Sequence, residues 1–210
     1  FILDKSGSMS GLEGDTIGGF NSMLERQRKE SGEAYVTTVL FDNNYELLHD
    51  RENIKTVKPI SRKEYFVGGT TALLDAMGNT INNIGMALSN LVEEQRPEKV
   101  LFVIITDGME NSSCEFTHNK IKQMIEHQKS KYFWEFIFLG SNIDAIGTAS
   151  SLGISEDKAV NFLCDSVGTE LNYKVVSEAV SSFRQGNKVD ASWKAEIEKD
   201  YNIRGKGRKQ

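Results

Sequence analysis

The sequence predicts an α/β domain built on a mostly parallel β-sheet. Short β-rich runs alternate with segments whose apolar residues recur every three to four positions, the pattern of strands separated by helices. The longest apolar run, residues 100–105, is continuous rather than alternating, as expected of a parallel strand covered on both faces. The composition, with 39% hydrophobic and 26% charged residues, is that of an ordinary globular protein. One compact domain can fill 210 residues.

The first fifty residues carry a strand, a helix and a hairpin. Residues 1–4 form a short apolar strand, and residues 16–29 form an amphipathic helix because their apolar side chains fall on one side. Two strand-like runs, 35–41 and 45–49, flank Asp42-Asn43-Asn44, residues that tolerate left-handed turn geometry. The resulting hairpin should supply the one antiparallel strand, at an edge of the sheet.

The middle of the chain holds the longest helix and the central strand. Residues 50–66 are polar and aperiodic, which predicts a loop with room for a short helix. Apolar residues recur every three or four positions from Leu73 to Leu91 and predict a long helix that ends before Pro97. The apolar run at 100–105 follows and should lie at the centre of the sheet.

The last third repeats the alternation of helix and strand. The expected elements are a helix at 117–129, a strand at 133–139, a helix at 143–152, a strand at 159–163 and a helix at 171–183. Residues 1–184 are therefore assigned to the domain. Its first strand is expected to be truncated at the N-terminus, because the chain begins in a strand without an initiator methionine.

Residues 185–210 are assigned to a C-terminal tail. Within it, Trp193, Ile197 and Tyr201 recur every four residues and predict a short helix docked on the body. The cationic run at 204–209 is expected to be a flexible, solvated end.

Charge and cysteine content exclude several classes of protein. The net charge of −5 disfavours binding to nucleic acid or to an anionic membrane surface. No apolar run approaches the roughly 20 residues that a membrane-spanning helix needs. Cys114 and Cys164 belong to no Cys-x-x-Cys pair, so we expect two ordinary thiols rather than a disulfide framework or a thiolate metal site. A cytoplasmic location is the expectation.

Two aspartates follow two of the predicted strands. Asp4 ends the first strand, and Asp107 follows the run at 100–105. Ligands of open parallel sheets bind outside the carboxyl ends of the strands, where the strand order reverses. If the two strands are neighbours, about 4.8 Å apart, the carboxylates face each other. Two like charges that close require either a proton or a cation between them.

Three hydroxyl residues complete a set of oxygen ligands. Ser6 and Ser8 follow at intervals of two, so in an extended loop their hydroxyls lie on the side of Asp4. Thr71 ends Gly68-Gly69-Thr70-Thr71 at the start of the long helix, where glycines let the backbone approach a site. Such hard ligands suit Mg²⁺, with Mn²⁺ as a close substitute, and do not suit zinc. The candidate metal ligands are Asp4, Ser6, Ser8, Thr71 and Asp107.

Three short motifs therefore stand in order along the chain, each at the end of an expected element. They are Asp4-x-Ser6-x-Ser8, Gly69-x-Thr71 with Ala76-Met77 beyond it, and an apolar residue followed by Thr106-Asp107-Gly108. Together they resemble the metal-ion-dependent adhesion site of von Willebrand factor A-type domains, and the resemblance covers residues 1–183. Residues 136–144, 152–154 and 159–162 are similar to small bacterial and phage members of that family.

The resemblance implies a doubly wound three-layer sandwich with helices on both faces of the sheet. It also implies that Mg²⁺ is held by the five candidates and completed by an Asp or Glu carboxylate from a partner protein. Thr70 is the alternative to Thr71, and the spacing to Ala76-Met77 favours Thr71. Met109, Glu110 and Asn111 are candidates for the rim of the partner surface.

Two functions remain open at this point. One is a metal-dependent protein-binding module; the other is a metal-dependent hydrolase or phosphotransferase with Asp4 as nucleophile. Phosphatases with an aspartyl nucleophile need a second carboxylate two residues later as general acid, and that position is Ser6. The three histidines lie on polar segments where we expect solvation, and no P-loop or dinucleotide-binding glycine pattern occurs. The sequence favours binding over catalysis.

Overall fold

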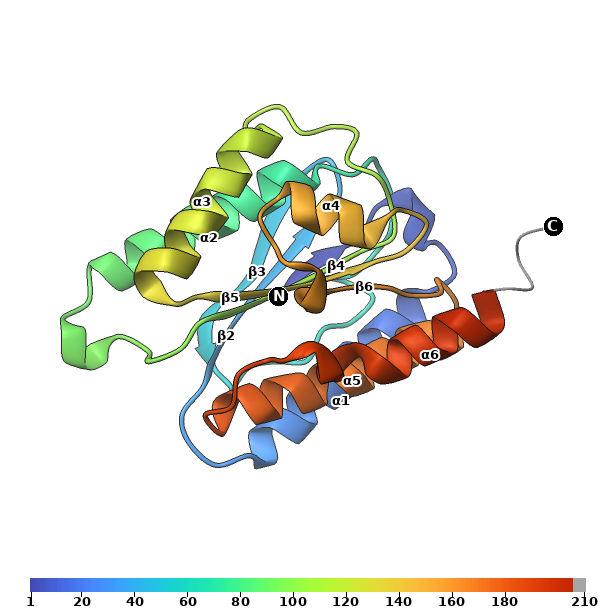
Figure 1. Ribbon diagram of the computed structural model, residues 1–210. Helices are drawn as coiled ribbons and strands as arrows, with labels where there is room; N and C mark the ends of the chain where they lie inside the picture. The colour runs from blue at the N-terminus through green and yellow to red at the C-terminus, as the bar shows by residue number, and fades with distance from the viewer. Residues whose placement is uncertain (206–210) are drawn as a thin grey trace.

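One sheet of six strands runs through the middle of the computed structural model, which describes residues 1–205 (Figure 1). The strands are β1 (Ile2–Asp4), β2 (Tyr35–Phe41), β3 (Tyr45–Asn53), β4 (Leu101–Thr106), β5 (Glu135–Gly140) and β6 (Ala159–Asn161). Their order across the sheet is β3-β2-β1-β4-β5-β6. Neighbouring strands are parallel except β2 and β3, which form the predicted antiparallel hairpin and leave β3 at one edge.

Helices cover both faces of this sheet. They are α1 (Glu13–Lys29), α2 (Leu73–Ser89), α3 (His118–Tyr132), α4 (Ala145–Ser151), α5 (Ser166–Arg184) and α6 (Ala195–Arg204). One face packs against α1, α5 and α6, and the other against α2, α3 and α4 (Figure 1). The predicted three-layer α/β sandwich is confirmed. Among the described helices, none combines the length and the apolar character needed to cross a bilayer.

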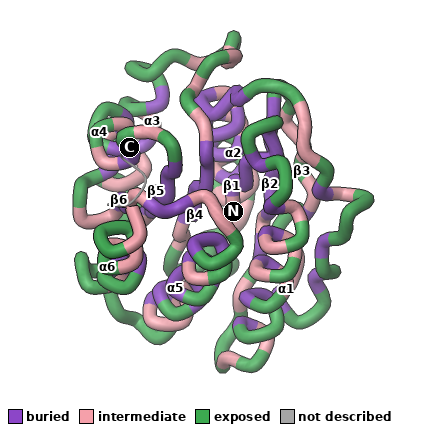
Figure 2. The backbone as a smooth tube through the Cα atoms, turned by 90° about the vertical axis from the view of Figure 1, so that its right-hand side faces the viewer, coloured by how far each residue is buried: buried purple, intermediate pink, exposed green. Residues whose placement is uncertain are grey.

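The side chains of the central strand β4 contribute to the apolar core on both faces of the sheet. Phe102 and Ile104 belong to the apolar cluster under α2, α3 and α4, whereas Val103 and Ile105 belong to the cluster under α1 and α5. Successive side chains of a strand point to opposite faces, so a continuous apolar run fills both layers. Figure 2 shows the consequence, because buried residues concentrate on the strands and on the sheet-facing sides of the helices.

The strand order reverses between β1 and β4. From β1 the chain continues to β2 on one side, whereas β4 is followed by β5 on the other. Leu3 pairs with Ile105, so the two strands end side by side. This is the switch point at which open α/β sheets place their ligand sites.

Several predicted elements are shorter than the elements observed, and α5 begins at Ser166 rather than at residue 171. Helix α1 begins at Glu13 rather than at residue 16, because its first turn is polar and adds nothing to the apolar period. Strand β3 continues to Asn53 rather than ending at residue 49, since this edge strand carries polar, solvent-facing residues beyond that point.

The short helix expected within residues 50–66 is wrong for the described structure. After β3, the chain as far as α2 contains turns and irregular backbone. Its buried residues Ile54, Val57, Ile60 and Tyr65 follow no helical period and pack onto the core beneath α1. The side chain of Asn21 holds this segment, because it donates to the Ile60 carbonyl and accepts from the Ile60 amide, both at 2.8 Å.

We expected His49 to be solvated, but it is buried. It lies opposite Thr38 in the β2–β3 pairing, and its side chain turns inward with only 4% of the residue exposed. Its Nδ1 lies 2.9 Å from Thr38 Oγ1. Burial lowers the pKa of His49 below its ordinary value.

The C-terminal segment contains the predicted short helix, α6, which contacts α5 and β6. Ile197 is 1% exposed within the core cluster under α1 and α5. The buried Lys194 Nζ donates to the carbonyls of Glu156 and Ala159, each at 2.8 Å. Trp193 Nε1 donates to the Asp157 carbonyl at 2.9 Å. The flexible, solvated end expected at 204–209 is wrong for Arg204, which ends α6 and is ion-paired with Asp165 and Asp200. Residues 206–209 of that run lie outside the described residues.

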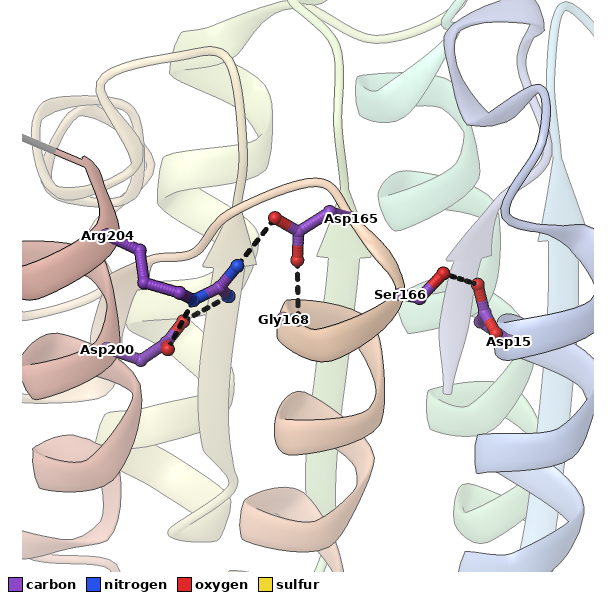
Figure 3. Close-up of polar contacts among 6 residues, drawn as sticks. All are labelled: Asp15, Asp165, Ser166, Gly168, Asp200 and Arg204. Atoms are coloured by element: carbon purple, nitrogen blue, oxygen red, sulfur yellow. Dashed lines mark hydrogen bonds and ion pairs between the residues drawn. The ribbon is translucent and has the colours of Figure 1, made fainter. Parts of the chain in front are cut away.

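Arg204 joins the end of α6 to the start of α5 (Figure 3). Its guanidinium donates to Asp165 at 2.7 Å and to both carboxylate oxygens of Asp200 at 2.6 Å. Asp165 also caps α5, because its Oδ1 accepts from the amide of Gly168 at 2.8 Å. The last turn of α6 is therefore tied to the rest of the fold by charge.

Candidate metal centre

The candidate site lies where β1 and β4 end. Asp4 is the last residue of β1, and Asp107 follows the last residue of β4. A third segment, Gly68 to Thr71, lies against the loop after β1, since Gly68 N donates to the Lys5 carbonyl at 2.9 Å. Three segments that are distant in sequence thus meet at the switch point.

Asp4 is held by residues on both sides of it. The Ser6 amide donates to Asp4 Oδ1 at 2.7 Å, and Thr106 Oγ1 donates to Asp4 Oδ2 at 2.6 Å. The Tyr65 hydroxyl donates to the backbone carbonyl of Asp4 at 2.6 Å. Tyr65 is fully buried, so this bond fixes the end of β1 from beneath.

Asp107 and the two serines form a connected group. Ser8 Oγ donates to Asp107 Oδ1 at 2.6 Å, and the hydroxyls of Ser6 and Ser8 are hydrogen-bonded at 3.1 Å. The hydroxyls of Ser6 and Ser8 lie together as predicted, but the expected extended loop is wrong, because Gly7 to Met9 form a single 3-10 turn. The turn still places both hydroxyls beside the aspartates.

Thr71 reaches the same point from the start of α2. A Cβ atom built on Gly108 would lie 3.1 Å from Thr71 Oγ1 and 3.4 Å from Ser8 Oγ, so both hydroxyls face Gly108. Thr71 is 3% exposed, whereas its neighbour Thr70 is exposed to solvent. The structure brings all five candidates together and favours Thr71 over Thr70.

The two carboxylates are buried without a balancing charge. Asp4 is 2% exposed and Asp107 is 1% exposed. Within residues 1–205, no Lys, Arg or His forms an ion pair with either. Burial raises the pKa of both groups, hydrogen bonds from Ser6, Ser8 and Thr106 oppose that shift, and the charge of Asp107 raises the pKa of Asp4 further. Such a pair is stabilised by a proton or by a cation.

The donor set fits a hard divalent cation. The described residues contain no cluster of three or more His, Cys, Asp or Glu side chains suited to a metal, so the candidate site depends on hydroxyls beside its two carboxylates. Side-chain oxygens of this kind are ligands for Mg²⁺ or Mn²⁺, and water would fill positions that the protein leaves open. The residues present therefore fit the ion that the sequence predicts.

One contact of the site could not have been found from the sequence. Cys164, which follows β6, donates from Sγ to Asp107 Oδ2 at 3.5 Å. Burial and the neighbouring Asp107 raise the pKa of Cys164 to about 12, so it is a neutral thiol at physiological pH. Nothing in the spacing of Cys164 indicates this contact, because 57 residues separate it from Asp107.

Comparison with known proteins identifies the fold. No family model matches the chain, and no curated protein matches its sequence. A von Willebrand factor type A structure from Catenulispora acidiphila matches with a TM-score of 0.58 and 12% identity, over 86% of this chain and 42% of that one. Proximal thread matrix protein 1 from the mussel byssus matches with a TM-score of 0.58 and 13% identity, over 86% and 45%.

This chain thus spans less than half of either matched chain. At such low identity the likeness concerns the fold and not the ligands, the partners or the organism of origin. The strand order, the helices on both faces and these matches agree: the chain has the fold of von Willebrand factor A-type domains.

Proposed function

We propose that this protein is a metal-dependent protein-binding module. In this proposal Mg²⁺ is held by the five clustered residues and accepts an Asp or Glu carboxylate from a partner protein. The observation that carries the proposal is the pair of buried carboxylates, Asp4 and Asp107, which face three hydroxyls and form no ion pair with a described basic side chain. The proposed ligands are Asp4, Ser6, Ser8, Thr71 and Asp107.

The charges of the ligands suit an acidic partner. Two carboxylates balance the charge of a divalent ion, and the hydroxyls of Ser6, Ser8 and Thr71 add none. A bound ion would supply a Lewis-acidic position for one more oxygen. A further carboxylate therefore meets a neutral site rather than a negative one, which lowers the electrostatic cost of binding it.

The surroundings of Asp4 favour binding over catalysis. Both of its carboxylate oxygens accept hydrogen bonds, from the Ser6 amide and from Thr106 Oγ1, which reduces their strength as nucleophiles. The residue two positions later is a serine rather than a carboxylic acid, so the general acid of an aspartyl phosphatase is missing there. We therefore propose a module that is not an enzyme.

Titration with metal and then with ligand tests this function. We expect the wild-type chain to bind Mn²⁺ and Mg²⁺ in calorimetry, and the loaded protein to bind an Asp- or Glu-bearing partner that EDTA releases. Asp107→Asn should lose both, whereas Asp144→Asn, at the exposed cap of α4, should lose neither. Absence of metal binding at millimolar Mg²⁺, or turnover of phosphate esters that Asp4→Asn removes, would overturn the proposal.

A further inference from the structure

Helix α2 begins without a cap of its own. The residue at its N-cap is Ala72, which has no side chain able to accept from the first free amides. A loop that follows β4 supplies the acceptors instead. Leu74 N donates to Glu110 Oε2 at 2.9 Å, and Asp75 N donates to Ser113 Oγ at 3.1 Å.

Thr71 is paired with the same loop through its backbone. Its amide donates to Asn111 Oδ1 at 2.9 Å, and its carbonyl accepts from the Asn111 amide at 3.0 Å. Asn111 thus holds both backbone polar groups of Thr71. Because Asn111 lies four residues after Asp107, this pairing joins two of the five proposed ligands across the switch point.

Two carboxylates accept hydrogen bonds from successive backbone amides of this loop, which has no regular secondary structure. Glu110 also accepts from the amides of Ser112 and Ser113, at 3.0 and 2.7 Å. In the other direction, Asp75 of α2 accepts from the three consecutive amides of Cys114, Glu115 and Phe116, at 2.7 to 2.9 Å. The loop therefore accepts hydrogen bonds from the first amides of α2, and α2 accepts hydrogen bonds from the amides of the loop.

We propose that Asn111 and Glu110 are positioning residues that fix Thr71 against Asp107 and thereby set the affinity of the site for Mg²⁺. This inference rests on the proposed function. The rim role expected of Glu110 and Asn111 stays a prediction beside this one, because Glu110 is half-buried and Asn111 is exposed. The same prediction stands for Met109, which is 71% exposed.

The physical basis of the proposal is preorganisation. A neutral hydroxyl is a weak ligand, so Thr71 contributes to binding only if its oxygen is already in place. Groups that orient metal ligands from outside typically change metal affinity by about 10- to 100-fold when they are removed. We expect an effect of that size from Asn111→Ala, which removes the acceptor of the Thr71 amide.

Calorimetric titration with Mn²⁺ alone separates a positioning role from a structural one. Asn111→Ala should bind Mn²⁺ about 10- to 100-fold more weakly than wild type. Asn111→Asp retains the acceptor oxygen and should bind close to wild type. Glu115→Gln, on the exposed side of the same loop, is the matched control and should leave affinity unchanged. The melting temperature of each variant is also measured without metal. A weaker affinity for Mn²⁺ in a variant whose metal-free melting temperature is unchanged indicates a positioning role rather than a structural one.

The outcomes distinguish this inference from the proposed function. If wild type binds Mn²⁺ and Asn111→Ala binds equally well, the positioning role is wrong while the metal site stands. If wild type does not bind, the proposed function falls and takes this inference with it. Should Asn111→Ala fail to fold, amide exchange of the metal-free wild type decides. The Thr71 and Leu74 amides should be as protected as the interior of α2, and rapid exchange at both overturns the proposal.

Discussion

Two of the charged regions of this domain are balanced in opposite ways. Where α6 meets α5, Arg204 lies between two carboxylates, Asp165 and Asp200, and donates to both (Figure 3). At the candidate metal centre, Asp4 and Asp107 face hydroxyls and a thiol, with no ion pair to a basic side chain of the described chain. The first region is balanced within the protein, whereas the second needs either a proton or a cation to offset its two carboxylates.

Burial makes this contrast sharper. The side chains of Asp165 and Asp200 keep 24% and 19% of their surface exposed, although each has a guanidinium partner. Asp4 and Asp107 are almost completely removed from solvent without one. An uncompensated buried charge costs more free energy than an exposed pair gains. This difference in burial and charge balance is the reason that we propose a functional role for the candidate metal centre.

The largest expected effect comes from removing one of the uncompensated carboxylates. Asp107→Asn should weaken Mg²⁺ binding by more than the roughly 10- to 100-fold typical of supporting residues, and abolish the rise in melting temperature that Mg²⁺ gives wild type. Without metal, the variant should melt no lower than wild type, because repulsion with Asp4 is relieved. Thermal unfolding with Mg²⁺ and with EDTA measures both. If Mg²⁺ raised the melting temperature of Asp107→Asn as much as that of wild type, the buried carboxylates would not be the site of metal binding, and the contrast between the two regions would be wrong.

The next largest effect should come from Lys194, at the start of α6, where the charge is likewise balanced within the protein. Lys194 is 5% exposed and donates to two backbone carbonyls and to Glu198, at 2.8, 2.8 and 3.0 Å. Lys194→Met leaves these acceptors unpaired, which should lower the free energy of unfolding by about 2 to 4 kcal/mol. The loss should be the same with and without Mg²⁺. Urea denaturation measures it, with the exposed Lys199→Met as control, and a loss confined to the Mg²⁺-loaded protein would contradict it.

Breaking the Arg204 bridge should cost less, because Arg204 and both partners remain partly exposed to solvent. Arg204→Ala should lower the free energy of unfolding by about 1 kcal/mol. The same measurement in 1 M salt should reduce the difference, since screening weakens ion pairs that contact solvent. A larger loss that ignores salt would show that the guanidinium acts by packing rather than by charge.

The sequence predicts most of this fold because its signals are local. The continuous apolar run that became β4 and the period of α2 each follow from burial alone, and both are confirmed. The polar first turn of α1 and the outer half of β3 carry no apolar signal, so their boundaries were missed. The inward turn of His49 depends on its pairing with Thr38, which no local pattern encodes.

The two aspartates of the candidate site could also be predicted from local signals, but the residues that support them could not. Asp4 and Asp107 follow strands, and the ends of parallel strands meet at one edge of the sheet. The residues that support them come from elsewhere in the chain. Tyr65, Asn111 and Cys164 act through contacts that depend on how loops cross the sheet. Their roles could be found only in three dimensions.

The smallest expected effect concerns a third buried group, His49, and appears as a dependence of stability on pH. Burial lowers the pKa of His49 in the folded state below its unfolded value of 6.5. Between those two values the unfolded chain binds more protons, so stability should fall as the pH drops through 6.5 toward the folded pKa, and no further below it. One proton limits the slope to about 1.4 kcal/mol per pH unit.

His49→Gln, which can still bond to Thr38, should lose that slope in urea denaturation between pH 7 and pH 5.5. The raised pKa values of Asp4 and Asp107 act with the opposite sign, because folded carboxyl groups that take up protons more readily gain stability as the pH falls. That contribution is common to wild type and variant, so the difference between their pH profiles isolates the histidine. An identical slope in both proteins would assign the acid sensitivity to titratable groups other than His49, Asp4 and Asp107.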